Sequence, residues 1–263
     1  MPGDDTMASA WLAKQTTTPL DLSPGQLRIA LDDTRPPTPD EATLARWETM
    51  RRAKPRLFNG PMLAFTSWDA ESFTVHSVVD GYQRLAVQPE VPTGVMQLSV
   101  TGVLLARDGL GREHVLLGKR ADATRLYEGM WELAPSGGID PPPTDAMLDS
   151  GARLDGFDAW RQLVLEIEEE LDLAIAPDPG QIVGLVSDPV AMSTDLVFRV
   201  ELTRPLEEMR PVDDPSTRTS DAGWEYRDTR WVATDEIGAF DLREPAEIIP
   251  PTRALFRMLG WVR

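Results

Sequence analysis

The sequence predicts a mixed α/β fold in two parts, a small α+β subdomain at residues 1–93 and a larger α/β domain at residues 94–263. Strand-like apolar runs alternate with a few amphipathic stretches throughout the chain. Strong apolar strands begin after Gly94, where the composition changes. The clearest helical pattern lies well inside the second part, at Asp158–Leu173.

The N-terminal part is expected to form one helix and a few strands. Residues 1–40 are polar and punctuated by prolines, and they contain one short candidate strand at Gln26–Leu31. Apolar residues at helical spacing predict a helix over Glu41–Ala53. Two β-like runs follow, at Met62–Trp68 and Ser72–Val79.

The second part is expected to combine several strands with the strong helix and a shorter one at the end. Residues 140–156 carry three successive prolines and several acids, which predicts an exposed loop before the helix. Strands are expected at Leu98–Leu105, His114–Leu117, Trp131–Ala134, Gln181–Ser187, Thr194–Leu202 and Thr229–Val232, with a final helix near Thr252–Leu259.

Composition narrows the classes of function. The 263 residues include 26 Lys+Arg and 43 Asp+Glu, a formal charge of −17, which argues against a nucleic-acid binder built on a basic face. Cysteine is absent, so disulfides and cysteine-based zinc sites are excluded, and the two histidines, His76 and His114, are far apart. A metal site would depend on carboxylates, whose oxygens favour Mg²⁺ or Mn²⁺.

The sequence shows no membrane signal. No run approaches 18 apolar residues, and the first residues are acidic, without a basic segment followed by an apolar stretch. We therefore expect a cytoplasmic protein with a small-molecule partner and no membrane or nucleic-acid partner. Whether it forms a homodimer stays open.

Three glutamates share one side of the helix at Asp158–Leu173. At about 100° per residue, Glu166, Glu169 and Glu170 fall beside the apolar stripe, whereas Glu168 points elsewhere. Like charges three or four residues apart repel by a few tenths of a kcal/mol per pair. The cluster is therefore either a solvated acidic face or a site for a cation.

Upstream motifs favour the cation site. The run Leu117-Gly118-Lys119-Arg120 precedes Trp131-Glu132-Leu133-Ala134-Pro135-Ser136-Gly137-Gly138-Ile139-Asp140, and the acidic helix follows. Over residues 95–240 this order resembles the Nudix hydrolases. The positions that match their signature are Gly138, Glu166, Ile167, Glu169, Glu170 and Leu173. The resemblance implies an α/β/α sandwich with a mixed sheet.

The match to this signature is partial. Leu165 stands where the family has arginine, Asp172 stands where it has glycine, and about 13 residues are inserted around Pro141–Asp155. Leu165 lies outside the apolar stripe, so we expect Phe157 or the inserted loop to cover it. Such burial would replace the family's Arg–Glu anchor, at roughly 1–3 kcal/mol for a well-covered leucine.

The resemblance also implies roles for site residues. Mg²⁺, or Mn²⁺, would be held by Glu166, Glu169 and Glu170, the last two being catalytic, and would act on a diphosphate. A later loop would supply the base, with Glu225 as first candidate and Asp228 as second; either is alternatively an exposed loop acid.

Other residues are candidates for binding substrate. Arg120 follows a strand and either clamps a phosphate or forms a structural salt bridge. Gly137 and Gly138 would let the backbone approach phosphates, unless they form a plain turn. The aromatic candidates for stacking on a base are Tyr127, Trp131 and Trp224.

A narrower resemblance concerns the substrate. The turn Phe58-Asn59-Gly60, the extended loop and the divergent helix are similar to features of the Nudix UDP-glucose/UDP-galactose pyrophosphatases. This resemblance implies cleavage of a UDP-hexose to UMP and hexose 1-phosphate, with the N-terminal part helping to cover the substrate. The alternatives are a pyrophosphatase for ADP-ribose, an ADP-sugar or coenzyme A, and a weakly catalytic ligand-binding domain. Retention of all three glutamates argues against the last.

Overall fold

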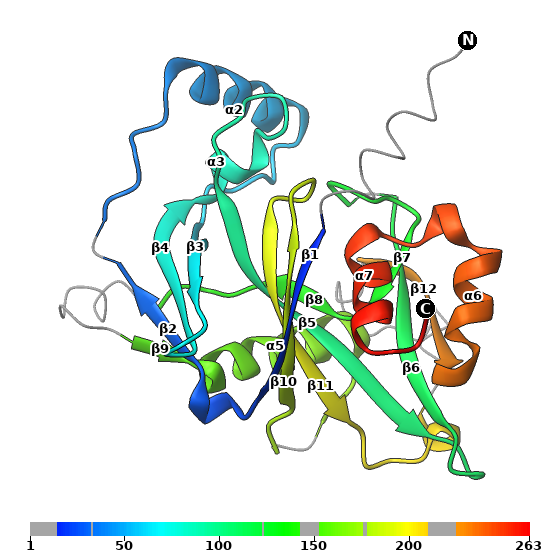
Figure 1. Ribbon diagram of the computed structural model, residues 1–263. Coiled ribbons are helices and arrows are strands. Elements are labelled where there is room, and N and C mark those ends of the chain that lie inside the picture. The colour runs from blue at the N-terminus through cyan, green and yellow to red at the C-terminus, as the bar shows by residue number, and fades with distance from the viewer. Residues whose placement is uncertain (1–14, 33, 123, 143–152, 176–177, 210–224) are drawn as a thin grey trace.

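The computed structural model shows a large mixed β-sheet with helices against both faces (Figure 1). It describes residues 15–32, 34–122, 124–142, 153–175, 178–209 and 225–263. The prediction of a mixed α/β fold is confirmed.

Strand β5, Met96–Arg107, organises the sheet. Along one edge it pairs in parallel with β11, Ser193–Glu201, from Gln97 to Leu105. Its other edge is shared by three antiparallel partners. They are β3 (Pro61–Asp69) near its start, β8 (Ser136–Gly138) next, and β6 (Glu113–Arg120) at its end.

The remaining strands extend the sheet on both sides of β5. They are β1 (Thr16–Leu22), β2 (Arg28–Leu31), β4 (Thr74–Gly81), β7 (Trp131–Leu133), β9 (Arg153–Asp155), β10 (Gln181–Asp188) and β12 (Tyr226–Ala233). The main order is β1-β10-β11-β5-β3-β4-β2-β9, and β6 branches from β5 and pairs with β7 and β12. Parallel pairing occurs in β5 with β11 and in β2 with β4, so the sheet is mixed.

The helices divide between the two faces. The bounds are α2 (Glu41–Ala53), α3 (Tyr82–Ala86), α5 (Gly156–Leu171), α6 (Ile237–Arg243) and α7 (Pro250–Met258). Helix α5 packs on β5 and β8, whereas α7 packs on β1, β7 and β10, with α6 next to it at the C-terminal end (Figure 1).

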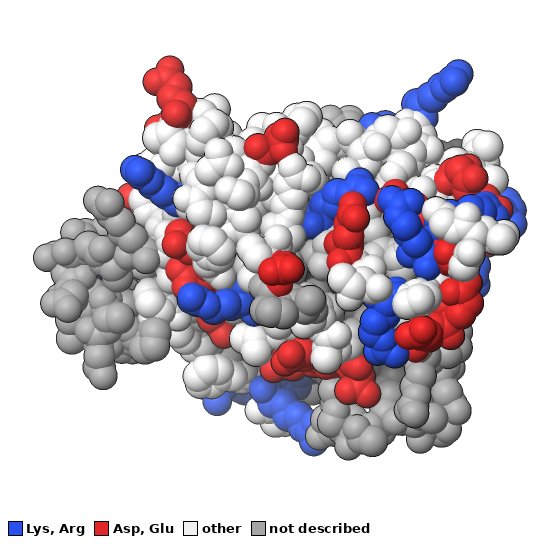
Figure 2. Space-filling model, turned by 90° about the horizontal axis from the view of Figure 1, so that it is seen from below, with Lys and Arg blue, Asp and Glu red and all other residues white. Residues whose placement is uncertain are grey.

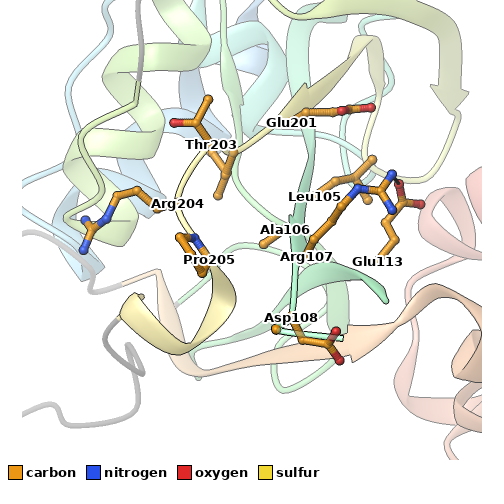
Figure 3. Close-up of a pocket in the computed structure, with 11 residues that line it drawn as sticks. Leu105, Ala106, Arg107, Asp108, Glu113, Glu201, Thr203, Arg204 and Pro205 are labelled. Atoms are coloured by element: carbon orange, nitrogen blue, oxygen red, sulfur yellow. Dashed lines mark hydrogen bonds and ion pairs between the residues drawn. The ribbon is translucent and has the colours of Figure 1, made fainter. Parts of the chain in front are cut away.

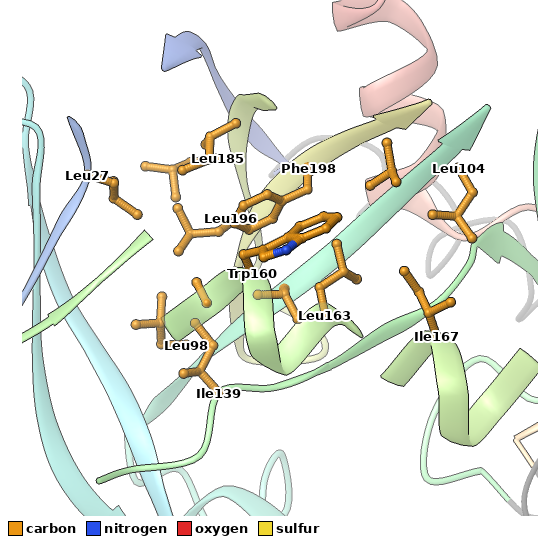
Figure 4. Packing of buried hydrophobic residues seen from close by; sticks show 14 of the residues in the cluster. Leu27, Leu98, Leu104, Ile139, Trp160, Leu163, Ile167, Leu185, Leu196 and Phe198 are labelled. Carbon is orange, nitrogen blue, oxygen red and sulfur yellow. The ribbon is translucent and has the colours of Figure 1, made fainter. Parts of the chain in front are cut away.

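The apolar stripe of α5 forms the main core. Its residues Trp160, Leu163 and Ile167 are buried against the sheet (Figure 4). The Trp160 ring lies 5.9 Å from that of Phe198, centroid to centroid. A second core lies under α6 and α7, where Trp131 contacts Phe240 edge-on at 5.8 Å. These two cores hold the sheet between helical layers.

Several elements differ from those expected. Strand β1 lies in the proline-rich start of the chain, β9 lies in the stretch expected to be a loop, and β8 follows Pro135 directly. Each of them pairs with a strand distant in sequence, so local pattern could not indicate them. Helix α6 is short, and its weak period escaped notice as well.

Strands from both sides of residue 93 share this one sheet. Strand β1 pairs with β10, β2 pairs with β9, and β3 pairs with β5. These hydrogen bonds join the two proposed parts, but they do not measure whether either part folds alone. The division at residue 93 stays a prediction.

Within the described residues, no helix combines the length and apolar character that crossing a bilayer requires.

The start of α5 depends on a side-chain cap, which leads to the first prediction. Asp155 accepts hydrogen bonds from the backbone N–H groups of Phe157 at 2.8 Å and Asp158 at 3.3 Å. Asp155→Ala should lower the free energy of unfolding by about 1 kcal/mol, measured by urea denaturation. The control is Glu168→Ala at an exposed position of the same helix. Equal midpoints for the two variants would contradict the capping role.

Candidate active site

A cavity of about 280 Å³ lies beside the N-terminal half of β5. Four of the residues singled out from the sequence line it, namely Arg120, Gly137, Gly138 and Glu225. The remaining lining residues are Tyr82, Leu85, Gln97, Ser99, Thr124, Arg125, Ser136, Ala191, Ser193 and Asp195. The structure thus brings together residues from both sides of residue 93 and from both sides of α5.

The alternation of side chains along β5 explains the polar floor of this cavity. Gln97, Ser99 and Thr101 occupy alternate positions and share one face of the strand. The register with β11 places Asp195 opposite Ser99. Farther along the same face the residues become apolar and join the core under α6 and α7. One face of β5 therefore lines the cavity near the start of the strand and packs in the core toward its end.

Three carboxyl groups, two from α5 and one from the segment before β12, meet next to this cavity. Glu170 is only 7% exposed, and it is hydrogen-bonded to Glu225. Burial raises the pKa of Glu170, and the charges of Glu225 and Glu166 raise it further. Burial also raises the pKa of Glu166, although Gln162 Nε2 donates to its carboxylate at 2.8 Å. Glu166 and Glu170 thus favour an added positive charge.

The third helix glutamate is placed differently. Glu169 is exposed, and its charge is among the causes that raise the pKa of Glu166. As the side chains lie, no set of three acidic or histidine residues in the described ranges forms a ready metal-binding group. The metal role of Glu166, Glu169 and Glu170 therefore stays a prediction.

Two observations fit a cation at these carboxylates. Glu170 Oε2 is buried, and no donor from the described residues reaches it. A Cβ on Gly137 would lie 2.2 Å from the Glu166 carboxyl, so only glycine leaves room there. Oxygen donors of this kind suit Mg²⁺ or Mn²⁺.

Arg120 is part of a buried network as well as the cavity wall. Its Nη1 donates to Glu132 at 2.5 Å, and Glu132 is also bonded to Tyr226. Burial lowers the pKa of Arg120, but the charges of Glu132, Tyr226 and Glu225 and the hydrogen bond to Glu132 together hold the pKa above its ordinary value. A Cβ on Gly118 would meet the Tyr226 ring at 2.5 Å, so glycine is needed beneath this network.

The other candidates lie at various distances from this cluster. Tyr127 donates from its hydroxyl to Asp188 Oδ2 at 2.6 Å and does not line the cavity. Trp131 is buried in the core, and Trp224 lies outside the described residues. Asp228 stands on β12 opposite Lys119, whereas Glu225 precedes this strand and lines the cavity. The geometry therefore favours Glu225 over Asp228 as the later carboxylate of the site.

The expected cover over Leu165 is not seen. Leu165 is 48% exposed, and the Phe157 ring lies against Gly25 instead. Most of the inserted loop lies outside the described residues. Among the described residues, the anchor of the resembling family has thus not been replaced by burial of Leu165.

Three residues of the site escaped the sequence interpretation. Glu132 lies inside the Trp131–Asp140 motif but received no role, and its near-complete burial was the missing fact. Arg125 lines the cavity and donates from Nη2 to the Ala191 carbonyl at 2.9 Å. Asp195 lies among polar residues at the start of strand β11, before its apolar run, so the residue pattern carried no distinct signal for it.

A second cavity, of about 390 Å³, lies at the other end of β5 (Figure 3). Two of its acidic residues form ion pairs with arginines. Glu113 bonds Arg107 at 3.3 Å and Arg199, which lies outside the lining, at 3.0 Å, and Arg199 also bonds Glu201 at 3.2 Å. Because these acids already have basic partners and no acid of the lining is buried, this cavity is the weaker candidate.

The surface charges contrast with the site. On the face shown in Figure 2, basic side chains lie beside acidic ones. Exposed pairs such as Arg112 with Asp235, at 3.0 Å, contribute roughly 0–1 kcal/mol each. No Lys or Arg of the described chain forms an ion pair with Glu166, Glu170 or Glu225. Among the described residues, these three carboxylates therefore have no basic side chain as an ion-pair partner.

Comparisons with known proteins were made at the level of sequence and structure. No protein-family model matches the chain, and a search of curated proteins found no significant match. One similar solved structure is a MutT/nudix family protein from Enterococcus faecalis, with 18% identity, a TM-score of 0.37, and coverage of 55% of this chain and 46% of that one. Another is a bifunctional NMN adenylyltransferase/ADP ribose pyrophosphatase from Francisella tularensis, with 14% identity, a TM-score of 0.42, and coverage of 68% and 44%.

A third similar structure is the NUDIX domain of Shewanella oneidensis NrtR complexed with ADP ribose. It shares 16% identity, with a TM-score of 0.39 and coverage of 66% of this chain and 91% of that one. This chain spans less than half the length of the Enterococcus and Francisella proteins. At these low TM-scores, the functional argument rests on the residues of the site itself.

The raised pKa of Glu170 predicts a dependence of stability on pH. The folded protein retains a proton there that the unfolded chain releases above about pH 4.3, so stability falls as the pH rises above that value. Without metal at pH 8, Glu170→Gln should be more stable than the parent by at least about 1.4 kcal/mol, the equivalent of one pKa unit. At pH 4 this difference should disappear.

Magnesium should stabilise the parent, because it binds the folded cluster. It should therefore raise the Tm of the parent and leave that of Glu170→Gln unchanged. Both effects are measured by thermal unfolding, with the exposed Glu168→Gln as control. Equal stability of parent and Glu170→Gln at pH 8 would contradict the electrostatic account of the cluster.

Proposed function

We propose that this protein is a divalent-metal-dependent Nudix hydrolase that cleaves the diphosphate of a nucleotide-sugar, of the UDP-glucose kind. The products would be a nucleoside monophosphate and a sugar 1-phosphate. The observation that carries the proposal is the cluster of Glu166, Glu170 and Glu225, of which Glu170 is buried, beside a cavity lined by Arg120 and Arg125. Acidic residues that would bind a cation thus lie next to basic residues that would bind phosphate.

The chemistry follows from these charges. Bound Mg²⁺ neutralises diphosphate oxygens and lowers the pKa of an attacking water. Glu166 and Glu170 would hold the ion, with Glu169 approaching from the exposed side of the helix. Glu225 would accept the proton of the water as its oxygen attacks one phosphorus. The bond from that phosphorus to the bridging oxygen breaks, and the bridging oxygen leaves with the other phosphate.

The two arginines would bind the diphosphate in different ways. Arg120 is held by Glu132, so its guanidinium is fixed in place. Arg125 is oriented by the Ala191 carbonyl, and burial lowers its pKa. A nearby anion would restore the preference of this guanidinium for its charged form.

The N-terminal part contributes to the same cavity. Tyr82 and Leu85, both on α3, line it beside Gln97 of β5. This placement supports the proposal that residues 1–93 help to cover the sugar-nucleotide.

A hydrolysis panel tests this function. With Mg²⁺, the parent should release monophosphate from UDP-glucose faster than from ADP-ribose, an ADP-sugar or coenzyme A. Glu225→Gln should lower kcat by roughly 10²–10⁴-fold if Glu225 is the base. Glu168→Gln, at an exposed position of the same helix as Glu170, should match the parent. Faster cleavage of ADP-ribose or coenzyme A would reject the nucleotide-sugar assignment, and no cleavage at all would reject the reaction.

A second test concerns Arg125, which lines the cavity. Arg125→Met should lower kcat/KM for the best substrate by about 10–100-fold, since hydrogen bonds to charged groups contribute about 1.5–3 kcal/mol. Arg204→Met, in the second cavity, should leave it unchanged. Steady-state kinetics measure both variants. An equal loss in both would show that the effect is general rather than local to this cavity.

A further inference from the structure

Asp195 lines the cavity, and one of its carboxylate oxygens is buried without a hydrogen-bond donor among the described residues. Its Oδ2 accepts a hydrogen bond from Thr101 Oγ1 at 3.0 Å, and the Ser193 hydroxyl also stabilises the carboxylate. Its Oδ1 is buried, and no described residue donates to it. Burial raises the pKa of Asp195 to about 7 in spite of both hydroxyls. A buried acceptor without a donor is costly, which calls for a compensating partner.

The protein's own cations are directed elsewhere. Arg120 is bonded to Glu132, and Arg125 is bonded to the Ala191 carbonyl. The charges that act most on Asp195 are those of Asp188 and Glu132, and both disfavour its ionised form. Asp188 itself is occupied, because it accepts from Gln15, Tyr127 and Val190. The missing donor is therefore not supplied by these neighbours.

The cavity consequently has two chemically different walls. Arg120 and Arg125 present positive charge, which suits a diphosphate. Asp195 presents an acceptor beside Ser99 and Gln97, and a carboxylate there repels phosphate while attracting O–H or N–H groups. A substrate that spans both walls must carry a phosphate end and a donor-bearing end.

We propose that Asp195 determines specificity by accepting, at Oδ1, a hydrogen bond from the group that the substrate carries beyond its diphosphate. That donor is either a sugar hydroxyl or a base N–H. The inference rests on the proposed function and adds a recognition residue to it. A site built to bond a donor discriminates strongly against an analogue that lacks it, because the buried acceptor is then left unpaired.

The test compares substrate analogues on the parent and on Asp195→Asn. The asparagine carbonyl can still accept from Thr101, which turns an amide N–H₂ toward the cavity, so a donor would face a donor. With UDP-glucose, kcat/KM should fall by about 10–100-fold, mainly through KM. Glu201→Gln, at the far end of the same strand, is the control and should match the parent. Asp195→Ser provides a smaller second variant should Asp195→Asn fold poorly.

Three analogues then identify the donor. They are N3-methyl-UDP-glucose, which lacks the base N–H, 2′-deoxy-UDP-glucose and the UDP ester of 2-deoxyglucose. One of these should be a poorer substrate than UDP-glucose for the parent, and that penalty should vanish in Asp195→Asn. A merely structural role would lower activity equally for all four compounds. That uniform loss, or unchanged kinetics in Asp195→Asn, overturns the inference while leaving the proposed function intact.

Failure of the proposed function gives a different result. Binding of UDP-glucose and ADP-ribose to the parent is measured by calorimetry beside hydrolysis. If the parent binds without cleaving, the analogue comparison is made on binding, and the same penalty is expected. If it neither binds nor cleaves either compound, the proposed function and the inference are both rejected.

Discussion

The placement of strand β5 is the constraint on which the site depends. Leu98 and Val100 point from this strand into the core that α5 completes, whereas Gln97 and Ser99 line the cavity and Thr101, on the same face, donates to Asp195. The same twelve residues therefore fix the helix that carries the glutamates and the strand that carries Asp195. Because the side-chain period of a strand is two, a shift of one residue would exchange these faces. The glutamate cluster and Asp195 thus depend on the same register.

Burial of apolar side chains on α5 offsets the repulsion between the carboxylates of the same helix. Leu163, Ile167 and Leu171 are almost fully buried, and they lie at the spacing that places Glu166 and Glu170 beside them. Each buried leucine or isoleucine stabilises by roughly 1.5–3 kcal/mol, so the helix holds its position although its glutamates repel one another. The burial that raises the pKa of Glu170 is a consequence of this packing.

The spacing of apolar residues predicted the helices and strands whose pattern lies within the element itself. The helix at Glu41–Ala53 matches its observed bounds, and the long strands were found from runs of apolar residues. Strands β1 and β9 were missed because their partners are remote, as when Thr16 pairs with Ser187. The site divides in the same way. Glu166 and Glu170 follow from helical period, whereas the role of Asp195 depends on Thr101, 94 positions away, and no local pattern contains that contact.

The two departures from the Nudix signature, Leu165 and Asp172, leave the apolar stripe of α5 unchanged. Asp172 adopts a left-handed conformation at the end of the helix, with φ 51°, where the family has glycine. Aspartate tolerates this region better than most residues, so the helix still ends there at a modest cost. Leu165 remains half exposed and contributes little to the core. Neither change displaces the apolar stripe that orients Glu166 and Glu170, and the carboxylate cluster is therefore independent of the anchor that the sequence lacks.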